Sequence, residues 1–164
     1  MTENNRCPLC DRELGRGGAA AFRNQAAHLA CWLEWREGSR PAPRPTVLVV
    51  DDDDAGRYTT SRILRSANFE VTEAPSGSAA LTAVASRPDV VLLDMQLPDF
   101  DGFEICRRIK SDPRTQSVRV LPFTAVFRHE GDRRRAIQLG ADGYLVRPVS
   151  AQELLATIND LIRN

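Results

Sequence analysis

The chain of 164 residues lacks an apolar run long enough to cross a membrane, and its polar amino terminus lacks the apolar segment of a secretory signal. It also lacks an excess of either charge, because 22 basic and 22 acidic residues give a formal net charge of zero. Bulk electrostatics therefore give no reason to expect a nucleic-acid or membrane partner. We expect a cytoplasmic protein without either partner.

Lysine is almost missing, since Lys110 is the only one and arginine supplies every other basic side chain. The remaining composition, with 27% charged and 42% hydrophobic residues, is ordinary for a globular protein. The length suits one ordinary domain and a small second one. The amino-terminal arginines are scattered and no helix-turn-helix pattern follows, which argues against a transcription factor.

The four cysteines are unevenly distributed, because three of them lie within the first 31 residues. With one histidine they form a Cys-x2-Cys-x17-His-x2-Cys pattern made of Cys7, Cys10, His28 and Cys31. Two close pairs of such ligands suit one tetrahedral, structural Zn²⁺ with no open coordination position. We expect a helix over residues 27–37 that places His28 and Cys31 on one face, a spacing that resembles treble-clef or LIM-like zinc modules. The alternative is a small metal-free core.

Three alternating prolines at positions 41, 43 and 45 disfavour a helix and favour an extended spacer. The sequence therefore predicts three parts. Residues 1–40 form a zinc-binding module, residues 41–46 form a proline-rich linker, and residues 47–164 form the larger domain.

Strand and helix patterns alternate at short intervals through this larger domain. We expect strands at 47–50, 69–74, 89–93, 118–123 and 143–146, and helices at 55–68, 76–86, 103–110, 130–139 and around 154–162. Five such units predict an α/β fold, with a parallel sheet covered by helices on both faces.

Chemically active side chains follow these predicted strands. Asp51 and Asp52 follow the first strand and Asp94 follows the third, while Thr124 and Arg147 follow the fourth and fifth. Because the carboxyl ends of parallel strands share one edge of the sheet, these side chains should meet in one crevice. Clustered carboxylates need a cation, and oxygen ligands suit Mg²⁺. Asp94 is then the candidate nucleophile toward phosphorus.

Two neighbouring groups have simpler interpretations. Asp53 and Asp54 are expected to cap the following helix and to place a charge in its first turn. Cys106 is expected to lie in the core, away from any metal.

At these positions the sequence resembles the receiver domain of two-component response regulators. The matching segments are Val47-Leu-Val-Val-Asp-Asp52, Val91-Leu-Leu-Asp-Met-Gln-Leu-Pro-Asp-Phe-Asp-Gly102, Thr124-Ala125 and Gly140-Ala-Asp-Gly-Tyr-Leu-Val-Arg-Pro148. The resemblance implies a flavodoxin-like sheet of strand order 2-1-3-4-5. It also implies that an aspartate receives a phosphoryl group from the phosphohistidine of a sensor kinase.

The resemblance also implies roles for single residues. Asp94 would be the phosphoacceptor, beside the acidic pair Asp51 and Asp52. Asp52, Asp94 and the backbone carbonyl of Gln96 would hold Mg²⁺. Thr124 would hydrogen-bond a phosphoryl oxygen, and the rotamer of Tyr144 would follow it.

Arg147 departs from the family, which usually has a lysine there. Its planar guanidinium is not equivalent to an ammonium group, so the change is either neutral drift or the mark of slow phosphorylation or an altered switch. The family also implies a cis peptide bond before Pro148, which would aim residue 147 into the crevice.

The sequence therefore predicts a response regulator that accepts a phosphoryl group on Asp94 from a sensor histidine kinase. It would be a signalling protein and not an enzyme, and it would contact a downstream protein through the receiver surface or the zinc module. The sequence leaves open whether the protein forms a homodimer. The alternative function is a phosphorylation-independent scaffold with the same fold.

Overall fold

The computed structural model describes residues 19–22, 25–28, 44–125 and 130–163, and the chain divides into two units, 1–43 and 44–164. In the first unit, strand β1 (Ala19–Phe22) pairs antiparallel with β2 (Gln25–His28). The expected start of a helix at Ala27 is therefore wrong, because Ala27 pairs with Ala20 across this ladder and local helix propensity is a weak prior. Residues 29–37 lie outside the described part.

The second unit is built on a parallel sheet of five strands. These are β3 (Thr46–Val50), β4 (Glu70–Ala74), β5 (Val90–Leu93), β6 (Arg119–Thr124) and β7 (Leu145–Val146). Their order is β4-β3-β5-β6-β7, and each neighbouring pair is parallel. Numbered within this unit, the order is 2-1-3-4-5, which confirms the predicted flavodoxin-like topology.

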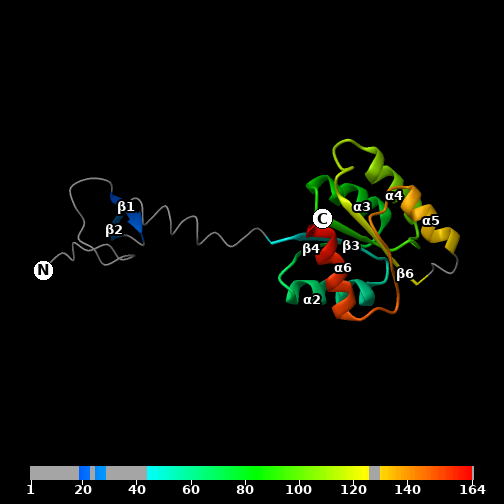
Figure 1. Ribbon diagram of the computed structural model, residues 1–164, viewed down its shortest axis with the longest axis horizontal. Helices are drawn as coiled ribbons and strands as arrows, with labels where there is room; N and C mark the ends of the chain where they lie inside the picture. Colours follow the sequence, from blue (N-terminus) through cyan, green and yellow to red (C-terminus); the bar gives the residue numbers. More distant parts are fainter. Residues whose placement is uncertain (1–18, 23–24, 29–43, 126–129, 164) are drawn as a thin grey trace, which may run out of the picture. The chain divides into compact units, whose positions relative to one another are not determined.

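Helices cover both faces of this sheet (Figure 1). They are α2 (Asp54–Ser66), α3 (Gly77–Ala83) with the 3-10 turn η1 (Val84–Ser86), α4 (Gly102–Ser111), α5 (Glu130–Gln138) and α6 (Ala151–Arg163). Helices α3, α4 and α5 lie on one face, while α2 and α6 lie on the other. Within the described ranges, no helix is long and apolar enough to span a membrane.

The central strands divide their side chains between two cores. In β3, Leu48 and Val50 pack toward α3, α4 and α5, whereas Val47 and Val49 pack toward α2 and α6. All four residues of β5 are buried as well. An apolar residue at every position is what a strand covered on both faces requires, and burial of this apolar surface stabilises the sheet.

Two expectations about individual residues are confirmed. Asp53 is the N-cap of α2 and accepts a 2.7 Å hydrogen bond from the Gly56 backbone N–H, and Asp54 lies in the first turn. Cys106 is fully buried in the core beside α3 and α5, where burial raises the pKa of its thiol to about 11.

Candidate functional site

Three carboxylates meet at the carboxyl edge of the sheet. Asp51 and Asp52 follow β3, Asp94 follows β5, and each offers an oxygen within 4.8 Å of the other two. This donor set fits Mg²⁺, because it consists of hard oxygen ligands whose mutual repulsion a cation would relieve. The structure therefore brings these three residues together at one edge of the sheet, as the sequence predicts.

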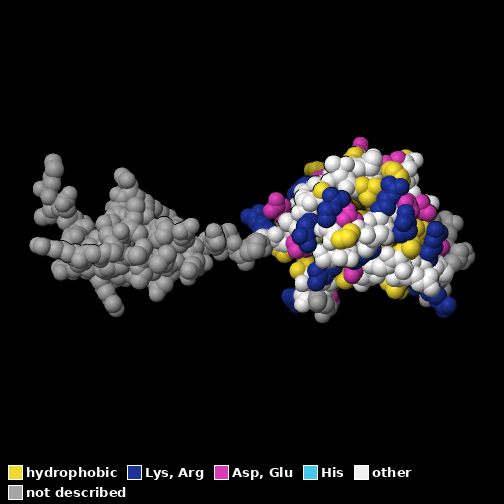
Figure 2. All heavy atoms as spheres, turned by 90° about the horizontal axis from the view of Figure 1, so that it is seen from above, with side chains coloured by type: hydrophobic (Ala, Val, Ile, Leu, Met, Phe, Trp, Pro, Cys, Tyr) yellow, Lys and Arg dark blue, Asp and Glu magenta, His cyan; other side chains and the backbone are white. Residues whose placement is uncertain are grey.

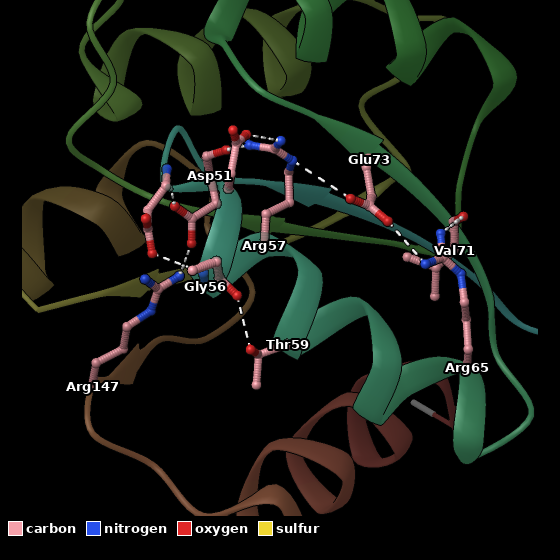
Figure 3. Close-up of polar contacts among 11 residues, drawn as sticks. Asp51, Gly56, Arg57, Thr59, Arg65, Val71, Glu73 and Arg147 are labelled. Carbon is pink, nitrogen blue, oxygen red and sulfur yellow. Dashed lines mark hydrogen bonds and ion pairs between the residues drawn. The ribbon is translucent and has the colours of Figure 1, made fainter.

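Asp51 lies at the centre of the site, with both carboxylate oxygens already engaged (Figure 3). Its Oδ1 accepts a 2.9 Å hydrogen bond from the Asp53 backbone N–H, and its Oδ2 lies 2.5 Å from Nη2 of Arg147. The side chain is only 1% exposed. A buried carboxylate of this kind needs a charged partner, and Arg147 supplies it.

Asp94 is less deeply buried and less tightly held. Its Oδ1 accepts a 3.1 Å hydrogen bond from the Gln96 backbone N–H, while its Oδ2 lies 3.9 Å from Nη1 of Arg147. The following loop returns so closely that the Gly102 N–H donates to the Met95 carbonyl at 3.2 Å. The loop therefore fixes the direction in which Asp94 leaves the end of β5.

Arg147 reaches the carboxylates across the face of an aromatic ring. The guanidinium carbon lies 4.1 Å from the centroid of Phe123, a distance typical of a cation–π contact. The Arg147 backbone N–H donates to the Thr124 carbonyl at 3.0 Å, and the Arg147–Pro148 peptide bond is cis. The contacts of Arg147 with Asp51 and Asp94 place its side chain in the crevice, as the resemblance implied.

The two predicted switch residues differ in their surroundings. Thr124 ends β6 and is fully buried. Tyr144 is 38% exposed, and the guanidinium of Arg133 lies 4.7 Å from the centre of its ring. The structure brings Asp51, Asp52, Asp94 and Arg147 together, whereas the Tyr144 ring lies against α5.

Sequence reasoning missed two residues that support the site. Arg57 donates a 2.7 Å hydrogen bond to the Asp51 backbone carbonyl and also forms ion pairs with Asp54 and Glu73 (Figure 3). Its place one helical turn past the acidic run was the available signal. Phe123 lies within a predicted strand, and nothing local to it indicates that Arg147 lies on its ring.

The predicted zinc ligands Cys7, Cys10 and Cys31 lie outside the described residues. The backbone of His28 belongs to β2, and its side chain is outside the description as well.

Figure 2 shows charges of both signs on one face of the second unit, where basic side chains (dark blue) lie among acidic ones (magenta).

Comparison with known proteins places this geometry in a family. The response regulator receiver domain matches residues 47–159. The DNA-binding dual master transcriptional regulator RpaA of Synechocystis is 37% identical over 120 residues, which cover 73% of this chain and 49% of RpaA. The response regulator PleD of Caulobacter vibrioides is 38% identical over 119 residues, which cover 71% of this chain and 26% of PleD.

A solved structure agrees with these sequence relatives. The chemotaxis response regulator CheY4 of Vibrio cholerae has a TM-score of 0.66 at 28% identity, with 72% of this chain and 98% of that chain covered. The match to this chain spans about half of RpaA and about a quarter of PleD. The receiver match nevertheless includes every strand of the five-stranded sheet and all three clustered aspartates, and the chain belongs to the response regulator receiver family of two-component systems.

Proposed function

We propose that this chain accepts a phosphoryl group on Asp94 from a sensor histidine kinase and passes the signal on through protein contacts. Receiver domains bind Mg²⁺ at an acidic aspartate cluster. The observation that carries the proposal is the approach of Asp51, Asp52 and Asp94 within 4.8 Å at the end of the sheet. Asp94 is the proposed acceptor because it is the carboxylate at the tip of the central strand.

In the proposed transfer, an Asp94 carboxylate oxygen attacks phosphorus and forms a new P–O bond. The P–N bond to the imidazole of the donor breaks, and its electron pair returns to the ring nitrogen, which takes a proton from solvent. Asp51, Asp52, Asp94 and the Gln96 carbonyl would hold Mg²⁺, which neutralises charge on the phosphoryl oxygens when bound. Asp94 thus acts as the nucleophile toward phosphorus.

Arg147 and Thr124 are the proposed groups for the phosphoryl oxygens. A guanidinium can donate two parallel hydrogen bonds to such a group, and the Thr124 hydroxyl can donate one. The added charge and acceptor oxygens would draw Thr124 toward Asp94, and the ring of Tyr144 would follow. Its contact with Arg133 on α5 is the element that would then change.

Labelling with acetyl phosphate tests the acceptor. The wild-type chain is expected to gain one phosphoryl group in the presence of Mg²⁺, as detected by intact-mass spectrometry. Asp94→Asn should gain none, while Asp101→Asn should be labelled normally, because asparagine caps a helix about as well as aspartate. Label on Asp94→Asn equal to wild type would overturn the assignment.

The alternative of a phosphorylation-independent scaffold is favoured by one observation, the ion pair that already occupies Asp51. The two functions differ in what Asp94→Asn does to partner binding. A pull-down from cells with and without an active kinase should recover different partners with wild type, and the same partners with Asp94→Asn. Identical recovery from wild type in both conditions would support the scaffold.

For the amino-terminal segment, we propose a structural Zn²⁺ bound by Cys7, Cys10, His28 and Cys31, within a module of residues 1–40 joined by a linker of residues 41–46 to a receiver of residues 47–164. The ligand spacing supports this metal. Elemental analysis should find about one zinc per chain, and Cys10→Ser should lose it. A metal-free wild-type chain would contradict the proposal. We further propose that the protein acts in the cytoplasm.

A further inference from the structure

Phe123 and Asp51 hold the Arg147 guanidinium from two sides. The ring of Phe123 lies 4.1 Å from the guanidinium carbon, and Asp51 Oδ2 lies 2.5 Å from Nη2. Movement of the arginine away from Asp51 would therefore also disturb its contact with the aromatic ring. Phe123 itself is 6% exposed and belongs to the core between the sheet and helices α2 and α6.

The third nitrogen of this guanidinium, Nε, has an unfavourable environment. Arg147 Nε is buried without a hydrogen-bond partner among the described residues. Leaving such a donor unpaired is unfavourable, so the ion pair and the ring contact must together offset its loss of water. Arginine suits this position better than lysine, since only a planar cation can lie flat on a ring while it donates sideways to a carboxylate.

The position of Arg147 affects the metal site directly. Asp51 Oδ1 accepts the Asp53 N–H and Oδ2 is held by Arg147, so a cation that binds through Oδ2 competes directly with the guanidinium. Arg147 Nη1 also lies 3.9 Å from Asp94 Oδ2. The arginine is therefore the resident counter-charge of the carboxylate cluster.

From this geometry we propose that Phe123 is a positioning residue. Its ring holds Arg147 beside Asp51 and thereby weakens the binding of Mg²⁺. Binding of the ion separates Arg147 from Asp51 and frees the guanidinium for the phosphoryl group. Phe123 sets how readily that exchange occurs. This inference rests on the Mg²⁺ site of the proposed function and extends it to a residue outside the acidic cluster.

A double-mutant cycle on the full chain tests the inference, with Mg²⁺ affinity measured from amide NMR shifts at constant ionic strength. Phe123→Leu keeps the charge of Arg147 but removes the ring, and should tighten Mg²⁺ binding about two- to tenfold. In an Arg147→Gln background the same substitution should leave Mg²⁺ affinity unchanged, because no guanidinium remains to be held. Phe123→Tyr retains an aromatic ring and should bind Mg²⁺ with the wild-type affinity.

Phe123→Met replaces Phe123→Leu if the leucine protein does not fold, since methionine fills irregular space without an aromatic face. An equal change in affinity in both backgrounds, or none in either, would overturn the role of Phe123 while the Mg²⁺ site stands. A wild-type chain that binds no Mg²⁺ would instead overturn the proposed function and this inference with it.

Discussion

Lys110, the only lysine of the chain, forms a 2.7 Å ion pair with Asp142, and the same Asp142 oxygen accepts a 2.7 Å hydrogen bond from the Val120 backbone N–H. Asp142 thereby joins α4 to the start of β6. The Lys110 side chain is only 14% exposed, so this pair is better shielded from solvent than the two pairs that arginines of α4 form with Glu104.

We expect unequal effects from the two ends of this pair. Asp142→Ala leaves a buried backbone N–H and the ammonium without their acceptor, and should lower the free energy of unfolding by about 1–3 kcal/mol. Lys110→Met removes one charge but leaves Asp142 bonded to Val120, and should cost less than about 1 kcal/mol. Urea denaturation of both variants checks the asymmetry, and equal losses would contradict it.

Gly102 is predicted to tolerate no side chain. A Cβ there would lie 2.6 Å from the Met95 Cα and 3.0 Å from the Asp94 carbonyl oxygen. Gly102→Ala should therefore displace the loop after β5, slow labelling of Asp94, and lower stability by about 1–3 kcal/mol. The matched control is Gly131→Ala in α5, where a Cβ would meet nothing within 4 Å. That variant should be neutral or more stable by up to about 1 kcal/mol, because alanine favours a helix. Similar behaviour of the two proteins would refute the steric argument.

The sequence predicted the sheet and its acidic edge because both depend on local patterns. The apolar run of β5 ending at Asp94 is visible in the sequence, and parallel strands bring such ends together. The same reasoning predicted that Arg147 would meet the aspartates at this edge. Its place on the Phe123 ring is different, because that contact depends on the tertiary packing of β6 and β7. The helix expected from Ala27 failed for the same reason, since pairing between β1 and β2 overrides a weak local preference.

Glu104 should make stability depend on pH in the acid range. Hydrogen bonds from Arg107 and then Arg108 hold its pKa well below the usual 4.5, at about 2. Because the folded chain binds this proton more weakly than the unfolded chain, the stabilisation is present above about pH 4.5 and is lost as the pH falls toward about 2. The difference in stability between wild type and Glu104→Gln should shrink over that interval. A carboxyl NMR titration of Glu104 with a midpoint near 4.5 would disprove the pairing.

Arg57 should support the acidic site through the backbone of Asp51. It donates to the Asp51 carbonyl at 2.7 Å and approaches Glu73 on β4 at 3.5 Å, and so fixes the backbone from which the acidic pair projects. Arg57→Gln should slow acetyl phosphate labelling of Asp94 by about tenfold or more, as the loss of groups that orient metal ligands usually does. Arg57→Lys should recover part of the rate, because an ammonium can still donate to the carbonyl. Arg62→Gln, on the exposed side of the same helix against Tyr58, is the control and should label at the wild-type rate. If the two glutamine variants label equally fast, Arg57 serves only the stability of α2, a role that denaturation would reveal and labelling would not.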